Sequence, residues 1–111
     1  MAKQPSPLDV LQSDFCAEQL KALSEPIRLR IVDVLRGGPK TVSDLAAAIE
    51  EEVVTVSHHL GILRHADLVD RERQGRFIVY SLKEGVLEAK PGSKAGEHIN
   101  LGCCRLELPK S

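Results

Sequence analysis

The chain has 111 residues, which is long enough for one domain with a modest hydrophobic core and too short for two ordinary domains. Aromatic residues make up 3% of it, so the core must be built from Leu, Val, Ile and Ala, and such a core suits helices. The net charge of −1 argues against a histone-like polycation. It does not exclude nucleic-acid binding, which depends on where the charges lie.

Neither a membrane span nor a secretory signal is evident in the sequence. No apolar run approaches the roughly 18 residues of a span, and Met1-Ala2-Lys3-Gln4-Pro5 lacks the apolar part of a signal, so we expect a cytoplasmic protein without a membrane partner. The three cysteines, Cys16, Cys103 and Cys104, are an odd number in what should be a reducing compartment. They are therefore expected to be free thiols or ligands, and not a structural disulfide framework.

The N-terminal third of the chain predicts a leader followed by two helices. Residues 1–7 contain two prolines and a serine, and residues 1–13 are expected to form a flexible leader. Ser13-Asp14 is a good cap for a first helix over about 14–24. Pro26 suits the first turn of a second helix, which Gly37-Gly38-Pro39 ends.

A third and a fourth helix follow. Thr41 with Asp44 three residues later is a capping-box variant, and the helix it starts ends at the acidic run 50–52. The next segment, 53–66, has an apolar stripe with spacings of 3, 4 and 3: Val53, Val56, Leu60 and Leu63. At about 100° per residue, His58 and His65 lie opposite this stripe, so the polar residues of the helix face outward.

The C-terminal part begins with a predicted β-hairpin. The runs "LVDRERQG" and "RFIVYSL" are rich in β-branched or aromatic residues and flank the turn at Gln74-Gly75. A fifth helix could begin at Glu84, but Pro91-Gly92 cuts it within about two turns. Residues 91–98 are predicted to be a loop, and "INLGCCRLELP" a short strand or extended tail. This divides the chain into a domain over 14–90 and a tail over 91–111.

The order of these elements predicts a mainly α-helical winged helix-turn-helix with a small β-hairpin. The outward face of the fourth helix carries small polar groups that could reach base edges in the major groove, and arginines around the hairpin tip could contact phosphates. The alternatives are solvated surface residues or a winged helix that binds only protein. The candidate DNA-binding residues are Thr41, Thr55, Ser57, His58, His59, Arg64, Arg71, Arg73, Gln74 and Arg76.

Four segments resemble the ArsR/SmtB-type winged-helix repressors of bacteria: "LKALSEPIRLRIVDVL" at 20–35, "TVSDLA" at 41–46, "VSHHLGILRHADLV" at 56–69 and "RERQGRFIVYSL" at 71–82. The resemblance implies a homodimer that binds an operator dyad on double-stranded DNA, represses transcription and often releases DNA when an inducer binds. Carried over by position, the recognition helix holds Thr55, Ser57, His58 and His59, the wing holds Arg73, Gln74, Gly75 and Arg76, and Thr41 contacts phosphate. Glu52 and Val53 depart from the family, which usually has a small cap and a glutamine there. Dimerisation is expected through the first helix and the residues after the wing.

Two metal sites familiar in this family are missing here. The third helix, "TVSDLAAAIE", contains no Cys-x-Cys pair, and Pro91-Gly92 interrupts the long C-terminal helix that would carry Asp and His ligands. The remaining candidates are Cys16, Cys103 and Cys104, whose thiolates could form a three-sulfur site for arsenite, cadmium or a similar soft ion acting as inducer.

A thiol redox switch and plain burial of the cysteines as small hydrophobes are the alternatives to ion binding. In an extended strand, the neighbouring side chains of Cys103 and Cys104 would point to opposite faces. His98 could join a metal site, although a lone loop histidine is more often solvated. No phosphate loop, nucleophile motif or suitably spaced carboxylate pair indicates an enzyme.

Overall fold

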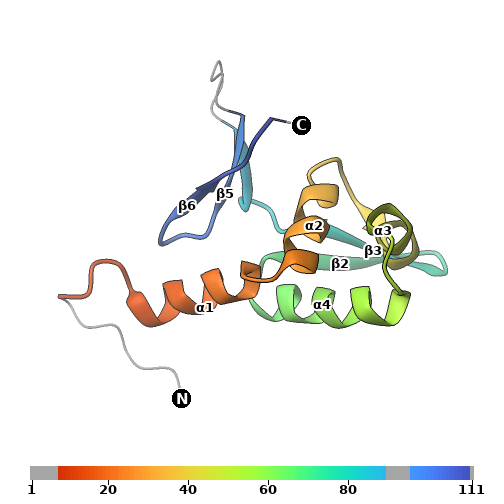
Figure 1. The fold of residues 1–111 in the computed structure, drawn as a ribbon, viewed down its shortest axis with the longest axis horizontal. Helices are drawn as coiled ribbons and strands as arrows, with labels where there is room; N and C mark the ends of the chain where they lie inside the picture. The colour runs from red at the N-terminus through yellow and green to blue at the C-terminus, as the bar shows by residue number, and fades with distance from the viewer. Residues whose placement is uncertain (1–7, 90–95, 111) are drawn as a thin grey trace.

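The computed structural model describes residues 8–89 and 96–110, and within these ranges the chain forms two small sheets packed around a group of helices (Figure 1). The helices are α1 (Ser13–Leu23), α2 (Pro26–Leu35), α3 (Val42–Ile49) and α4 (Val53–His65). The strands are β1 (Lys40–Thr41), β2 (Val69–Gln74), β3 (Phe77–Leu82), β4 (Leu87–Ala89), β5 (Glu97–Asn100) and β6 (Arg105–Glu107). In the described part of the chain, no helix is both long and apolar enough to cross a membrane.

The N-terminal ends of α2 and α3 are set by local signals, of which Pro26 and the Thr41–Asp44 pair were predicted and the Glu25 cap was not. The side chain of Glu25 accepts a hydrogen bond from the backbone N–H of Arg28, and Pro26 occupies the first turn of α2. At α3, the Thr41 hydroxyl accepts from the Asp44 N–H at 3.1 Å, and the Asp44 carboxylate accepts from the Thr41 N–H at 3.3 Å. The capping box predicted from the sequence is confirmed.

The predicted hairpin is confirmed as the β2–β3 ribbon, with a two-residue turn between Gln74 and Phe77. Gly75 opens that turn with φ of 63°, a left-handed conformation that glycine adopts without steric cost. The short strand β1 pairs with β3, so the sheet has the order β1-β3-β2. We call the β2–β3 hairpin the wing.

The prediction of a fifth helix from Glu84 is wrong. Residues 84–86 form a turn, and the chain then enters β4, which pairs with β5, and β5 pairs with β6. A helix of two turns has little stability of its own, whereas the strand pairs Leu87 with Ile99, whose side chain is 1% exposed. The predicted strand in the tail is confirmed, but the predicted loop ends before Glu97, where β5 begins.

Parts of the predicted leader and loop, including Pro91-Gly92, lie outside the described residues. His98, expected to be a solvated loop residue, instead belongs to β5 and is 7% exposed. Its Nε2 lies 3.1 Å from Oε2 of Glu88, and Asn100 donates a hydrogen bond to the other carboxylate oxygen, Oε1, at 2.9 Å. These bonds satisfy the polar groups that β5 buries.

The second sheet shares one hydrophobic core with the helices. Ile99 of β5 belongs to the same buried cluster as side chains of all four helices, together with Val86 just before β4 and Leu101 just after β5. Arg36, just after α2, fastens the sheet from outside the core: its guanidinium bonds to Glu97 at 3.1 Å and to the Pro109 carbonyl at 2.8 Å. The sheet therefore stands against α1 and α2, above them in Figure 1, while the wing points away to the right, opposite the start of α1.

Candidate nucleic-acid interface and thiol cluster

The recognition helix predicted from the sequence is α4, and it has one buried and one open face. Val56, Leu60 and Leu63 are fully buried, and Ser57, His58 and Arg64 on other faces are exposed. Val53 was assigned to the buried stripe, and this is wrong: its side chain is 46% exposed. The first turn is the free end of the helix, so the packing that buries the stripe begins one turn later, at Val56.

His59 and Thr55 occupy the flanks of α4 and are half-buried. Nδ1 of His59 lies 3.0 Å from Nη1 of Arg28 and 3.9 Å from the carboxylate of Glu25, so its ring is held against the start of α2. The ring of His58 packs against the ring of His59 in an edge-on arrangement with centroids 5.2 Å apart. His59, a candidate DNA contact, therefore also packs against the exposed ring of His58.

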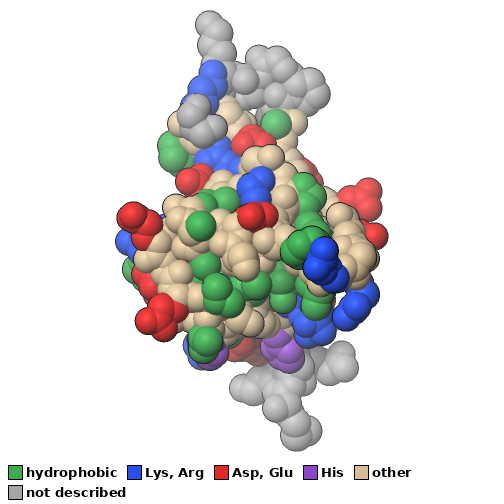
Figure 2. Space-filling model, turned by 90° about the vertical axis from the view of Figure 1, so that its right-hand side faces the viewer, with side chains coloured by type: hydrophobic (Ala, Val, Ile, Leu, Met, Phe, Trp, Pro, Cys, Tyr) green, Lys and Arg blue, Asp and Glu red, His purple; other side chains and the backbone are tan. Residues whose placement is uncertain are grey.

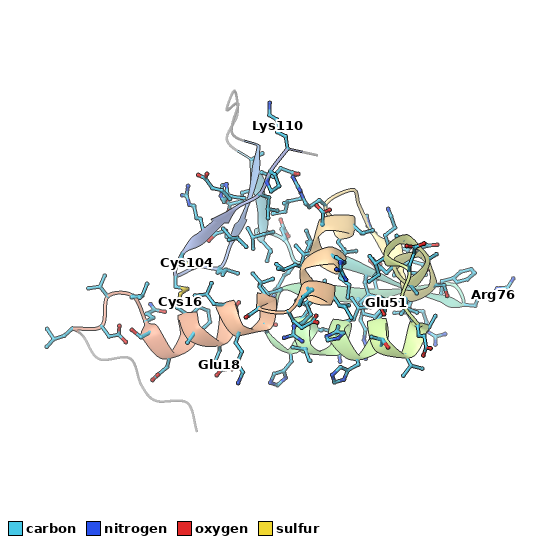
Figure 3. All side chains as sticks on the ribbon, viewed as in Figure 1. Cys16, Glu18, Glu51, Arg76, Cys104 and Lys110 are labelled. Carbon is cyan, nitrogen blue, oxygen red and sulfur yellow. A yellow bond between two sulfur atoms is a disulfide. The ribbon has the colours of Figure 1, made fainter. Side chains whose placement is uncertain are left out.

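The wing carries its cations at the surface. Arg71, Arg73, Gln74 and Arg76 are all exposed, and the guanidinium of Arg76 lies over the ring of Phe77 at 5.8 Å from its centroid. Figure 3 shows Arg76 at the far tip of the wing, projecting away from the rest of the fold. A cation at this place can reach a phosphate several ångströms beyond the body of the protein.

A groove of about 510 Å³ separates α4 from the base of the wing. Arg64 and His65 line it from α4 and Arg71 from β2, together with the carboxylates of Asp67 and Asp70. Figure 2 views the end of the molecule with the wing: hydrophobic side chains lie in the middle, Lys and Arg gather mainly at the lower right, and Asp and Glu lie at both the left and the upper right edges. Basic and acidic side chains therefore both line the groove beside the C-terminal half of α4.

Thr41 has a defined place at the N-terminus of α3. It is half-buried, and its hydroxyl oxygen already accepts the capping hydrogen bond from Asp44. The hydroxyl hydrogen is still available as a donor, so a phosphate contact remains compatible with the cap.

The three cysteines come together although they lie near opposite ends of the sequence. Cys16 is in α1 and is 3% exposed, and Cys103 and Cys104 lie between β5 and β6. All three Sγ atoms lie within 4.8 Å of one another. Cys104 is 3.6 Å from Cys16 and 3.8 Å from Cys103 (Figure 3).

Cys16 and Cys103 form a disulfide, and Cys104 is a free thiol. The expectation that no cysteine would be disulfide-bonded is therefore wrong, because the fold of the second sheet returns the chain to α1 across 87 residues. Adjacent cysteines in a strand would point apart, but here a tight turn closed by the bond from Leu101 N–H to Cys104 O holds them. Gly102 permits this turn with φ of 87°.

Comparisons with known proteins agree with this architecture. A family model described as a helix-turn-helix domain matches residues 23–72. The chain is 43% identical over 68 residues to the transcriptional repressor SdpR of Bacillus subtilis, covering 61% of the chain and 76% of SdpR. It is 49% identical over 77 residues to the transcriptional regulator NmtR of Mycobacterium tuberculosis, covering 69% of the chain and 64% of NmtR.

A solved structure extends the likeness to three dimensions. It is the homodimeric winged helix-turn-helix DNA-binding domain of Mb0332 from Mycobacterium bovis, a possible ArsR-family regulator, with a TM-score of 0.63 and 33% identity over 74% of this chain and 75% of that one. The chain belongs to the ArsR/SmtB family of winged helix-turn-helix transcriptional regulators. It is accordingly a DNA-binding regulator of transcription and not an enzyme.

Within this ArsR/SmtB regulator, two residues matter that the sequence patterns did not single out. Val54 in the first turn of α4 is 78% exposed, and Arg28 joins α2 to the middle of α4. A helical wheel signals Val54, because it lies four residues before His58 and so on the same face. Nothing local signals Arg28, since its partner is 31 residues away in the sequence.

Proposed function

We propose that this regulator is a cytoplasmic homodimeric repressor that places α4 in the major groove of each operator half-site and the wing on the flanking backbone. The observation that carries the proposal is the open face of α4, where Ser57 and His58 are exposed beside the groove lined by Arg64 and Arg71. Small polar groups read base edges, and arginines supply sequence-independent attraction to phosphates. We assign the other candidate DNA contacts to the same surface: Thr41, Thr55, His59, Arg73, Gln74 and Arg76.

The homodimer is proposed from the apolar surface of α1 and the segment before it. Leu11, Phe15 and Leu20 are 54%, 48% and 46% exposed, a costly arrangement for a lone chain and a suitable one for a second copy. The similar Mycobacterium bovis domain is itself homodimeric. A two-fold axis near α1 would present two copies of α4 to half-sites about 34 Å apart.

The inducer is proposed to be a soft thiophilic ion, arsenite or cadmium, bound by reduced Cys16, Cys103 and Cys104. Sulfur ligands at about 2.3 Å from one ion lie roughly 3.3–4.0 Å from each other, and the separations of 3.6 and 3.8 Å from Cys104 fit this geometry. Three thiols and As(OH)₃ would give a tris-thiolate and three water molecules. Because the ligands lie on α1 and the second sheet, an ion would tie the proposed dimer helix to the C-terminal tail.

A second candidate function, redox sensing, is favoured by the disulfide between Cys16 and Cys103. Formation of this bond removes two protons and two electrons from the two thiols; hydrogen peroxide would accept them to give two water molecules, and an organic hydroperoxide to give an alcohol and water. Both functions use Cys16 and Cys103, but only the ion site requires Cys104, since the disulfide forms without it.

The DNA-binding proposal is tested by mobility-shift titrations at several salt concentrations. The double variant Arg73→Ala, Arg76→Ala should bind all duplexes more weakly and with a shallower salt dependence, whereas Ser57→Ala and His58→Ala should lose preference between sequences. Equal binding by the wild type and every variant would refute the proposal. A flat salt dependence of the wild type would indicate a protein-binding module instead.

The sensing proposals are tested with operator complexes of single cysteine variants. Under reducing conditions, arsenite or cadmium should release wild-type protein from DNA, and Cys104→Ser should remove this response. If a peroxide releases the wild type and Cys104→Ser equally, and Cys103→Ser is insensitive, the redox function is the correct one. Arsenite release of the Cys103→Ser, Cys104→Ser double variant would refute the ion site.

A further inference from the structure

The first turn of α4 exposes apolar side chains where a soluble helix would normally place polar ones. Val54 is 78% exposed and Val53 is 46% exposed, and the preceding N-cap residue, Glu52, makes no side-chain capping bond. Burial in the core does not account for Val54. The exposed valine therefore needs another explanation, and its position on the helix provides one.

Val54 lies on the outermost face of α4. At 100° per residue it points about 160° away from Val56, the first residue of the buried stripe, and its neighbour on the same face one turn later is His58. Gly61 follows on this face, where a side chain would meet nothing within 4 Å. Val54 is thus the first member of a row that the proposed function directs into the major groove.

We propose that Val54 reads the C5-methyl group of a thymine in each operator half-site; the inference rests on the proposed placement of α4 in the groove. The N-terminal residues of a recognition helix are the ones that contact base edges. Thymine alone among the four bases presents a methyl group in the major groove, and an apolar side chain is its complement. Burial of two apolar groups that are otherwise hydrated then favours thymine over cytosine at that position.

Contact with DNA explains the position of Val54 better than contact with a second copy of the chain. The neighbours of Val54 on its face are an exposed imidazole and a bare glycine, not further apolar side chains. The larger exposed apolar set, with Leu11, Phe15 and Leu20, lies on and before α1. Figure 1 shows α1 extending from the end of the molecule opposite the wing and the first turn of α4.

The test removes the methyl group from the DNA and the valine from the protein in turn. A bound duplex is first selected from a random library with the wild type, and each thymine is then replaced singly by deoxyuridine, which lacks only the methyl. Wild-type affinity should fall by about three- to tenfold at one thymine per half-site. For Val54→Ala, replacing that thymine by deoxyuridine should cause no further loss of affinity. The control Val53→Ala should lose affinity on this replacement as the wild type does.

The outcomes separate this inference from the proposed function. Suppose that Ser57→Ala and His58→Ala change sequence preference. If deoxyuridine then has no effect at any position, or weakens binding of Val54→Ala as much as that of the wild type, the proposed thymine contact is wrong, and the proposed DNA-reading face of α4 is retained. Loss of the methyl effect in Val53→Ala alone would assign the contact to Val53 and overturn the proposal. If Val54→Ala changes the dimer dissociation constant and not the methyl effect, the valine covers a protein interface. Val54→Ala should fold, because alanine favours helix and no packing is lost.

Discussion

Nη1 of Arg28 lies 3.0 Å from Nδ1 of His59, which joins the first turn of α2 to the middle of α4. Because a guanidinium can only donate, this nitrogen of His59 must be the acceptor, and the neutral ring carries its hydrogen on Nε2. The same guanidinium donates to the carbonyls of Ala22 at 2.6 Å and Lys21 at 3.3 Å, at the C-terminal end of α1. One side chain therefore connects α1, α2 and α4.

We expect amide variants of His59 to separate the roles of its two ring nitrogens. Asparagine places its oxygen near the position of Nδ1 and can accept from Arg28, whereas glutamine places its polar end near Nε2. His59→Gln should lower the free energy of unfolding by about 1–3 kcal/mol, and His59→Asn by clearly less. Urea unfolding of both variants measures the difference, and equal losses would show that the bond from Arg28 contributes little.

Removal of the charge of Glu52 should strengthen DNA binding. Its carboxylate stands at the N-terminus of α4 without making a capping bond, close to where phosphates are proposed to lie. Glu52→Ser should raise affinity by about two- to fivefold at low salt through reduced repulsion. It should also stabilise α4 by roughly 0.5–1 kcal/mol through a new cap.

The control for Glu52 is Glu18→Gln, which removes an equal charge from an exposed position on α1, at a distance from the wing (Figure 3). This variant should leave DNA affinity unchanged. Equal gains from both variants would indicate a general effect of net charge and not repulsion at the first turn of α4.

Gly61→Ala should separate stability from DNA binding. A Cβ at this position would meet nothing within 4 Å, so alanine should stabilise the helix by about 0.5–1 kcal/mol. On the open face of α4, the added methyl should obstruct approach to the duplex and weaken binding. Thermal unfolding and a mobility shift give the two readouts, and a variant that is stabilised yet binds as well as the wild type would remove Gly61 from the interface.

The second sheet should become less stable in acid through Glu88. Hydrogen bonds from Asn100 and then His98 hold the pKa of the Glu88 carboxyl below its ordinary value of 4.5. A lowered folded-state pKa contributes stability above pH 4.5, and this contribution is lost as the pH falls through the folded-state value. The melting temperature of the wild type should exceed that of Glu88→Gln at pH 6 and approach it near pH 3; a constant difference would contradict this linkage.

Patterns within a few residues of one another predicted most of the domain correctly. The caps at Pro26 and Thr41, the turn at Gly75 and the spacing of Val56, Leu60 and Leu63 act over one or two turns or a single hairpin, so their effect can be deduced from neighbouring residues. Ser57 and His58 could be assigned to an outward face for the same reason, whereas Thr55 and His59, also expected to face outward, lie half-buried on the flanks of α4. The exception, Val53, sits at a helix end, where periodicity does not determine whether a partner covers the side chain.

The tertiary structure decided what depends on distant partners. Residues 84–89 have a weak helical pattern, and pairing with β5 makes them a turn and a strand because the ladder bonds and the burial of Ile99 outweigh two turns of isolated helix. The meeting of Cys16 with Cys103 and the bond between Arg28 and His59 span 87 and 31 residues. Sequence spacing alone determined which side chains could serve as ligands or DNA contacts. Packing of the whole chain was needed to bring the three thiols together, because no interaction between residues close in sequence holds Cys16 near Cys103 and Cys104.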